Sequence, residues 1–201
     1  MPEAVIFDYG AGNLLSLKVA LEKVGLKAKI NSTKQVLKTA DAIALPGVGN
    51  FSAAADKLEH VRIEIFDAVK NGVPLLGICL GLQLFFPRSD EGAGDGLGLY
   101  DGNNAWLPNS VKVPHMGWNT LRIVKQTELL DDIKEDSYVY FVHSLYPVPA
   151  DKELICTETD YGTTFTSSIA TRNVFGTQFH PEKSGDVGLQ ILRNFARTVK
   201  K

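Results

Sequence analysis

The residues of this sequence that are best suited to chemistry surround one of its two cysteines. Cys79 lies at the centre of Gly77-Ile78-Cys79-Leu80-Gly81, between an apolar run and a helical pattern. A nucleophile on a tight strand-to-helix turn needs small residues two positions away on either side, because larger side chains would crowd the backbone. The N-terminus of the following helix favours a thiolate at that position. A buried structural cysteine is the alternative, but the two glycines favour a nucleophile.

Such a cysteine needs a base, and His180 has an orienting group close by in the sequence. Glu182 follows it by two residues, and side chains two apart in an extended segment point to the same side. Glu182 can therefore fix the tautomer and orientation of the His180 ring, as the acid does in a nucleophile–base–acid triad. We predict Cys79, His180 and Glu182 as nucleophile, base and orienting acid.

Two other histidines fit the role of the base less well. His143 is the rival, but the residue two positions after it is Leu145, which cannot orient a ring. His60 lies in a charged helical stretch and is interpreted as a surface residue. Because the chain has only two cysteines and scattered histidines, we expect no metal site and no cofactor.

The run Pro46-Gly47-Val48-Gly49 closes an earlier apolar strand abruptly. Ligands of open α/β sheets bind along the carboxyl edge of the strands, which is also the edge expected to carry Cys79. Glycines there let backbone amides approach a ligand closely. Gly47 or Val48 can then donate to an oxyanion, together with the N–H of Leu80. An ordinary strand-terminating turn is the alternative for this run.

Strands that alternate with helices must position these groups. Apolar strands are expected over residues 5–8, 28–30, 42–45 and 73–78, and helical patterns at 51–59 and 61–71 lie among them. This alternation predicts an α/β fold with a mostly parallel central sheet and helices on both faces. Strand-like segments at 120–124, 138–143, 154–159, 163–170 and 174–179 predict an added mixed or antiparallel region. A last amphipathic helix begins near residue 184, and residues 1–201 are expected to form a single domain.

The composition narrows the classes of partner. Of the 201 residues, 44% are hydrophobic and 22% are charged, and the formal net charge is only -2. This balance gives no electrostatic reason to expect a nucleic-acid or membrane partner. The apolar run at residues 4–7 is too short for a membrane span or the core of a signal peptide. Two cysteines do not make a disulfide framework, so we expect a cytoplasmic protein.

Together, these motifs resemble those of the class I, or triad, glutamine amidotransferases. The resemblance rests on the segment around Cys79, on Pro46–Gly49, Pro114–Asn119 and Tyr140–Ser144, and on the run that begins at Gln178. It extends from residue 4 to about residue 196. It implies a flavodoxin-like fold and the hydrolysis of glutamine to glutamate and ammonia, through a γ-glutamyl thioester on Cys79.

The resemblance also implies further site residues. Gly49, Gln83 and Ser144 are expected to line the glutamine pocket. Val48 is expected to lie on an oxyanion strand that reorients for activity, so the isolated chain should be nearly inactive. Residues 86–96, which include Pro87 and several glycines, depart from the usual pattern and are interpreted as a loop without a chemical role.

The Pro114–Asn119 and Tyr140–Ser144 motifs resemble a subgroup that passes ammonia to a cyclase subunit in histidine biosynthesis. The cyclase is a (βα)₈ barrel, and no barrel sequence is present here, so the resemblance implies a heterodimer with a separate chain. Asn13, Trp118 and Lys183 match positions that face the cyclase. A partly buried core position is the alternative for Trp118.

Three other functions compete with this one. A related amidotransferase could supply a different synthase, although the two motifs of the cyclase subgroup speak against it. A stand-alone cysteine hydrolase acting on a γ-glutamyl or peptide bond would turn over rapidly without a partner. A binding module with a vestigial triad is the third, and the presence of all three triad residues disfavours it.

Overall fold

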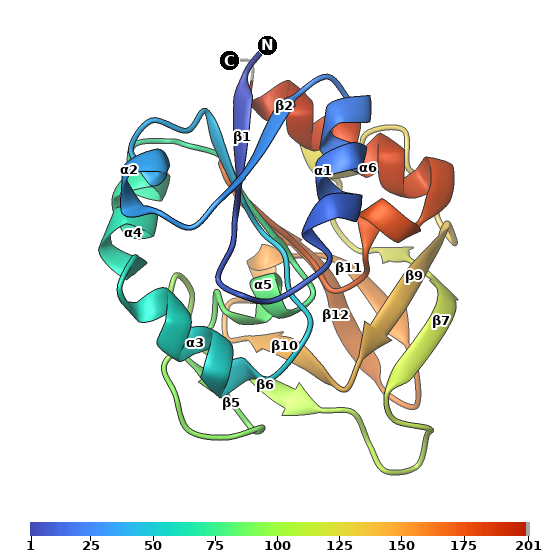
Figure 1. Cartoon of the computed structure of the whole chain (residues 1–201). Helices are drawn as coiled ribbons and strands as arrows, with labels where there is room; N and C mark the ends of the chain where they lie inside the picture. Colours follow the sequence, from blue (N-terminus) through green and yellow to red (C-terminus); the bar gives the residue numbers. More distant parts are fainter. Residues whose placement is uncertain (200–201) are drawn as a thin grey trace.

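An eight-stranded sheet forms the centre of the computed structural model, which describes residues 1–199 (Figure 1). Five neighbouring strands run parallel, in the order β2-β1-β3-β4-β13. They are β1 (Glu3–Phe7), β2 (Lys27–Asn31), β3 (Ala42–Leu45), β4 (Leu75–Ile78) and β13 (Val174–Thr177). Every residue of β3, β4 and β13 is buried, as expected where helices cover both faces of parallel strands.

The helices divide the hydrophobic core into two layers, one on each face of the parallel strands (Figure 1). α1 (Leu14–Lys23) and α6 (Gly185–Thr198) pack on one face, and α2 (Lys34–Leu37), α3 (Phe51–Glu59) and α4 (Arg62–Lys70) pack on the other. Successive residues of a strand point to opposite faces. In β1, Ala4 and Ile6 accordingly belong to the first layer, and Val5 and Phe7 belong to the second.

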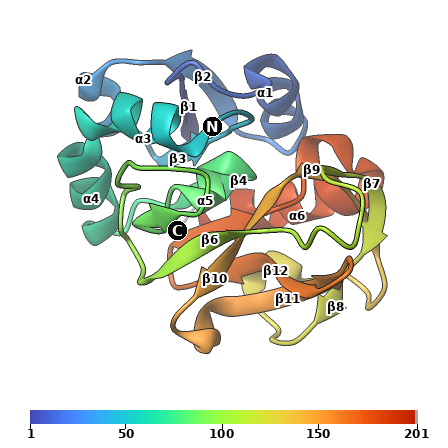
Figure 2. The same cartoon turned by 90° about the horizontal axis from the view of Figure 1, so that it is seen from below.

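Beyond β13 the sheet becomes antiparallel through three further strands, β12, β11 and β8. Two smaller sheets lie beside it: β10 pairs with β6, which pairs with β5, and β7 pairs with β9. Figure 2 shows this region on the side of the molecule away from α2 and α3. The bounds are β5 Arg88–Ser89, β6 Gly102–Trp106, β7 His115–Thr120, β8 Arg122–Ile123, β9 Tyr138–His143, β10 Leu145–Pro149, β11 Ile155–Asp160 and β12 Thr164–Ala170. Residues 1–199 also contain three 3₁₀ turns: η1 Glu128–Leu130, η2 Lys152–Leu154 and η3 Pro181–Lys183.

The predicted mostly parallel sheet with an added antiparallel region is therefore confirmed. The helix expected after Cys79 is present, but α5 (Leu80–Gln83) is short. The carbonyls of Leu84 and Phe85 accept hydrogen bonds from the amides of Leu97 and Leu99. Pro87 lacks the N–H that a continuing helix would need. Within residues 1–199, no helix is long and apolar enough to cross a membrane.

Candidate active site

Cys79 lies where β4 ends and α5 begins, and its backbone is strained. Its φ is 53°, a left-handed conformation that non-glycine residues rarely adopt and that is found at functional sites. The flanking glycines permit this tight turn. A Cβ on Gly81 would lie 1.8 Å from the carbonyl oxygen of Leu45, and a Cβ on Gly77 would lie 2.5 Å from Phe85. The sequence argument for small residues here thus has a direct steric cause.

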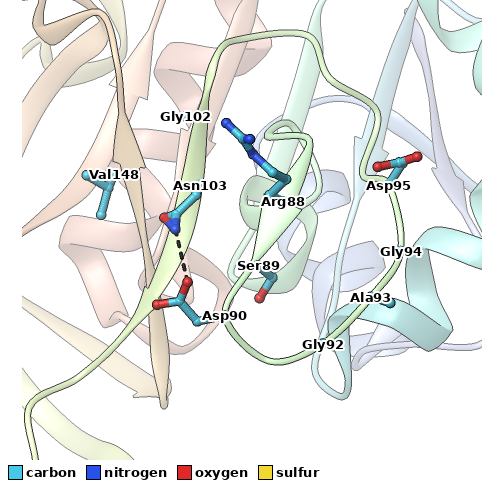
Figure 3. A pocket seen from close by; sticks show the side chains of 10 residues that line it. All are labelled: Arg88, Ser89, Asp90, Gly92, Ala93, Gly94, Asp95, Gly102, Asn103 and Val148. Atoms are coloured by element: carbon cyan, nitrogen blue, oxygen red, sulfur yellow. Dashed lines mark hydrogen bonds between the residues drawn. The ribbon is translucent and has the colours of Figure 1, made fainter.

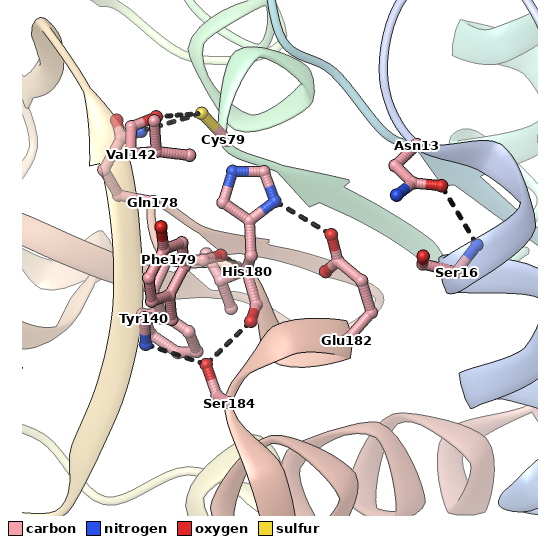
Figure 4. Close-up of polar contacts among 11 residues, drawn as sticks. Asn13, Ser16, Cys79, Tyr140, Val142, Gln178, Phe179, His180, Glu182 and Ser184 are labelled. Atoms are coloured by element: carbon pink, nitrogen blue, oxygen red, sulfur yellow. Dashed lines mark hydrogen bonds and ion pairs between the residues drawn. The ribbon is translucent and has the colours of Figure 1, made fainter. Parts of the chain in front are cut away.

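Hydrogen bonds from β9 and from the turn that follows His180 hold this residue beside Cys79. The backbone N–H of His180 donates to the carbonyl of Tyr140 at 2.9 Å, and the backbone carbonyl of His180 accepts from Ser184 Oγ at 2.7 Å. Glu182 Oε1 lies 2.8 Å from His180 Nδ1, and both side chains are 4% exposed. Figure 4 shows the ring between Glu182 and Cys79, with its second nitrogen on the side of the sulfur.

The surroundings of His180 favour its protonated form. Burial alone would lower its pKa, but Cys79 and Glu182 together outweigh burial and raise the pKa to about 10. The Nε2 atom of the ring is buried and makes no hydrogen bond with any of residues 1–199. Because it lies on the side of the sulfur, this atom is placed to exchange a proton with Cys79.

His143, the rival base, is held as a neutral ring. Its Nδ1 lies 2.8 Å from the carbonyl oxygen of Leu145, and a carbonyl can only accept a hydrogen bond, so Nδ1 carries the proton. Its Nε2 therefore accepts from His115 Nδ1 at 3.0 Å. Burial lowers the pKa of His143 to about 3 and that of His115 to about 4. Both ring nitrogens of His143 are thus engaged away from the sulfur, and the geometry favours His180 as the base.

One cavity of about 220 Å³ opens beside Cys79. It brings together most of the residues predicted for substrate and oxyanion binding, namely Val48, Gly49, Leu80, Gln83 and Ser144. Gly47 is buried next to this cavity. A Cβ there would lie 2.6 Å from Tyr9 Oη and 2.7 Å from the Cβ of Leu80. The segment Pro46–Gly49, called the oxyanion run from here on, can therefore approach α5 this closely only with glycine at position 47.

The backbone N–H of Leu80, which was predicted to bind an oxyanion, has a partner in this structure. It donates to the carbonyl oxygen of Gly47 at 3.3 Å. This N–H becomes available to a substrate oxyanion only when the Gly47 carbonyl turns away. Two residues further on, Gly49 has a φ of 135°, and apart from its chain neighbours no atom lies within 4 Å of where its Cβ would be.

The loop at residues 86–96, which was expected to have no chemical role, reaches the cavity through Glu91. Glu91 lines the cavity and also accepts a hydrogen bond from the N–H of Phe51 at the start of α3. β6 anchors the loop, because Asp90 accepts from Asn103 Nδ2 at 3.0 Å (Figure 3). A hollow of about 780 Å³ lies on this side of the loop, lined by Arg88, Ser89 and Asp95 among others. It contains no nucleophilic cysteine or histidine, so the chemistry stays with the Cys79 cavity.

Two further side chains near the sulfur were also missed by sequence reasoning. Gln178 Nε2 lies 3.4 Å from Cys79 Sγ. The hydroxyl of Tyr9 donates to the carbonyl of Pro46, at the start of the oxyanion run. Burial, and then the nearby Cys79, raise the pKa of Tyr9. Gln178 belongs to the motif around His180, but its type alone did not distinguish it from an ordinary buried strand residue.

The residues predicted to face a partner lie at the surface on neighbouring elements. Trp118 on β7 is 55% exposed, so it is not a core residue. Its ring centre lies 5.9 Å from that of Tyr140, and Lys183 Nζ lies 5.9 Å from the centre of the same Tyr140 ring. Asn13 is exposed and caps α1 by accepting from the N–H of Ser16 at 3.2 Å.

The fold is that of a known class of enzyme. The family model for class I glutamine amidotransferases matches residues 5–199, so the chain belongs to the class I glutamine amidotransferase family. The family prediction made from the motifs is confirmed.

The chain is similar over nearly its whole length to curated members of one subgroup. The imidazole glycerol phosphate synthase subunit HisH of Methanothermobacter thermautotrophicus is 47% identical over 97% of this chain and 98% of that protein. The subunit of the same name from Archaeoglobus fulgidus is 48% identical over 98% of each chain. The one from Pyrococcus furiosus is 47% identical over 98% of this chain and 100% of that protein.

Solved structures agree on the fold. PurLQS from Thermotoga maritima superposes with a TM-score of 0.77 over 98% of each chain, at 21% identity. A glutamine amidotransferase from Thermotoga maritima gives 0.71 over 100% of this chain and 99% of that one, at 13% identity. At these identities the likeness supports the fold alone, and the predicted amidotransferase fold is confirmed.

Proposed function

We propose that the chain is the glutaminase subunit of imidazole glycerol phosphate synthase and hydrolyses glutamine to glutamate and ammonia. The observation that carries the proposal is the His180 ring between Cys79 and Glu182, with Cys79 itself lining the cavity. The similarity to HisH subunits at 47% to 48% identity supports the choice of synthase. The whole chain, residues 1–201, acts as one glutaminase domain in the cytoplasm.

The first half of the reaction forms a thioester. His180 Nε2 takes the proton of the Cys79 thiol, and the sulfur attacks the side-chain carbonyl carbon of glutamine. The carbonyl oxygen becomes an oxyanion, which backbone N–H groups stabilise. His180 then returns its proton to the leaving nitrogen, so that ammonia departs and a γ-glutamyl thioester remains. Glu182 keeps the ring oriented and stabilises the imidazolium, as in other triads.

The second half releases glutamate. His180 takes a proton from a water molecule, whose oxygen attacks the thioester carbon. The carbon–sulfur bond breaks, and the proton returns to the Cys79 sulfur. Each cycle thus consumes one glutamine and one water and yields one glutamate and one ammonia. No group other than these side chains is required for the balance.

The cavity lining offers partners for polar groups of glutamine. The acidic side chain of Glu91 can pair with the α-ammonium group, because charge-assisted hydrogen bonds to carboxylates are strong. Gln83 and Ser144 supply neutral polar groups to the same cavity. We assign substrate binding to these residues and to Gly49, next to the oxyanion run.

The backbone N–H of Leu80, an expected oxyanion donor, is already bonded to the Gly47 carbonyl. This supports a glutaminase activity that depends on a partner. Turning the Gly47 carbonyl away would release the Leu80 N–H that it now accepts from, and Val48 is 44% exposed on the same run. The partner is the separate cyclase subunit of the synthase, in a heterodimer. We assign Asn13, Trp118 and Lys183 to this interface. Exposed tryptophans are enriched among residues that dominate binding energy. A stand-alone hydrolase would need a free oxyanion donor without any partner.

The decisive experiment measures glutamate release by the chain alone, by the chain mixed with the cyclase subunit, and by the mixture with a cyclase ligand added. We expect the isolated chain to be nearly inactive and the mixture to be active. Cys79→Ser should abolish the activity of the mixture, because a serine hydroxyl at this position remains protonated. Cys156→Ser is the matched control. Cys156 is buried and its thiol donates to the Leu154 carbonyl, so this variant should keep most activity. Full activity of Cys79→Ser would refute the mechanism, and full activity of the isolated chain would refute the need for a partner.

A further inference from the structure

The side chain of Gln178 is buried against the nucleophile. It is 0% exposed and lies just beyond β13, two residues before His180. Its Nε2 atom is 3.4 Å from Cys79 Sγ, and Figure 4 shows the two side chains facing each other. The triad mechanism gives this side chain no role.

A fixed acceptor determines which end of Gln178 faces the sulfur. Gln83 lies 2.9 Å from the carbonyl oxygen of Leu145, so its amide NH₂ group must be the end that points there. The same NH₂ group lies 3.1 Å from Gln178, which must therefore present its oxygen to Gln83. Gln178 is left with its NH₂ group toward Cys79. A reversed amide would bring two donor groups together.

The sulfur has a second polar neighbour that favours the other protonation state. The thiol can donate to the carbonyl oxygen of Val142, which lies 3.6 Å away. A thiolate cannot donate, and it gains only from a donor. Gln178 is such a donor, and hydrogen bonds to an ionised group are stronger than neutral ones. Of the two contacts, the one with Gln178 therefore grows when the proton leaves, and the one with Val142 is lost.

We propose that Gln178 is a further catalytic residue, which stabilises the Cys79 thiolate by donating an amide hydrogen to the sulfur. The inference rests on the proposed role of Cys79 as the nucleophile. The amide acts twice in each cycle, when the thiol loses its proton and again when sulfur leaves the thioester. Gln83 and the Leu145 carbonyl hold it in the donating orientation.

The titratable groups around the sulfur come from several elements. His180 and Glu182 lie at the turn after β13, Tyr9 follows β1, His143 ends β9, and Glu91 lies on the loop before β6. A substitution at Gln178 leaves all of them in place. Gln178→Met also adds no charge, so a change in the ionisation of Cys79 in that variant can be traced to the loss of the amide.

The test measures the rate at which iodoacetamide alkylates Cys79 as a function of pH, by mass spectrometry of the peptide that contains it. The full chain is used without glutamine, alone and with the cyclase subunit. Gln178→Glu keeps the acceptor for Gln83 but places a carboxylate against the sulfur, and Gln178→Met removes the donor at similar size. We expect the midpoint of alkylation to rise by about one to two pH units in both variants. Gln35→Glu, the same substitution on an exposed position of α2, should leave it unchanged.

A second measurement needs no substitution at Gln178. In the unsubstituted chain, the side-chain amide resonances of Gln178 should shift with pH at the alkylation midpoint, and in Cys79→Ser they should not. An unchanged midpoint in folded variants, or amide resonances that ignore the titration, would overturn the proposal. Because neither readout uses glutamine, they stand apart from the proposed function, which fails separately if Cys79→Ser retains glutaminase activity.

Discussion

His180 and His143 are both buried near Cys79, yet their rings meet partners of opposite character. His180 has the Glu182 carboxylate on one nitrogen and the sulfur beside the other. His143 has a backbone carbonyl on one nitrogen and the neutral ring of His115 on the other. The pKa is raised to about 10 for His180 and lowered to about 3 for His143.

The difference teaches that burial alone does not decide the role of a histidine. Burial disfavours the charged form at both positions, and only at His180 do the other interactions, with Cys79 and Glu182, outweigh it. Glu182 and Cys79 make His180 a group that can hold a proton next to the sulfur. The carbonyl of Leu145 makes His143 a fixed donor, which orders the backbone next to the cavity.

The largest expected effect separates the two histidines directly. Asparagine has an amide nitrogen near the position of Nδ1 but nothing at Nε2. His180→Asn can therefore keep its link to Glu182 but loses the atom that serves the sulfur. We expect glutaminase turnover in the complex with the cyclase subunit to fall roughly 10⁴-fold or more. His143→Asn should lower it by only about tenfold, since the carbonyl of Leu145 keeps a donor. Equal losses in the two variants would erase the distinction between base and positioning residue.

A smaller effect is expected from the carboxylate that distinguishes the two sites. Glu182→Gln removes the negative charge at similar size and should lower the pKa of His180. We expect turnover to fall roughly 10²- to 10⁴-fold. The pH–rate profile of kcat should also change its shape. Glu158→Gln is the control, because Glu158 pairs with Arg122 on the antiparallel strands. This variant should leave both the turnover and the pH–rate profile unchanged. A Glu182→Gln variant with the original profile would show that the carboxylate does not set the state of His180.

The sequence predicted the His180 site because all its parts lie in short motifs. The spacing of His180 and Glu182, and the glycines around Cys79, each depend on neighbours within a few residues. The parallel strands could also be predicted from the sequence, since buried strands form continuous apolar runs between helices. Local patterns therefore identified the group that donates the proton and the group that accepts it.

The His143 site could not be predicted, because its parts meet only in the folded chain. His115 and His143 face each other across β7 and β9, and β7 was not predicted as a strand. β10 was missed because Pro147 and Pro149 normally exclude a strand. It lies at the edge of its small sheet, where prolines are tolerated. Glu91 likewise reaches the cavity, and Gln178 the sulfur of Cys79, only through tertiary packing.

The smallest expected effect is on stability, and it has opposite signs at the two histidines. The folded-state pKa of His180 lies above its ordinary value of 6.5. Its contribution to stability is therefore full below about pH 6.5 and is lost as the pH rises through about 10. The folded-state pKa of His143 lies below 6.5. Its contribution is present above about pH 6.5 and is lost as the pH falls towards about 3.

For a difference of one bound proton, the free energy of unfolding changes by about 1.4 kcal/mol per pH unit. Thermal unfolding of the isolated chain between pH 4 and pH 10 measures this slope. His180→Asn should flatten the alkaline limb of the profile and leave the acid limb unchanged. His143→Asn should flatten the acid limb only in part, because burial also lowers the pKa of His115. If both variants flattened the same limb, the two rings would not be held in opposite protonation states, and the division between the two sites would fail.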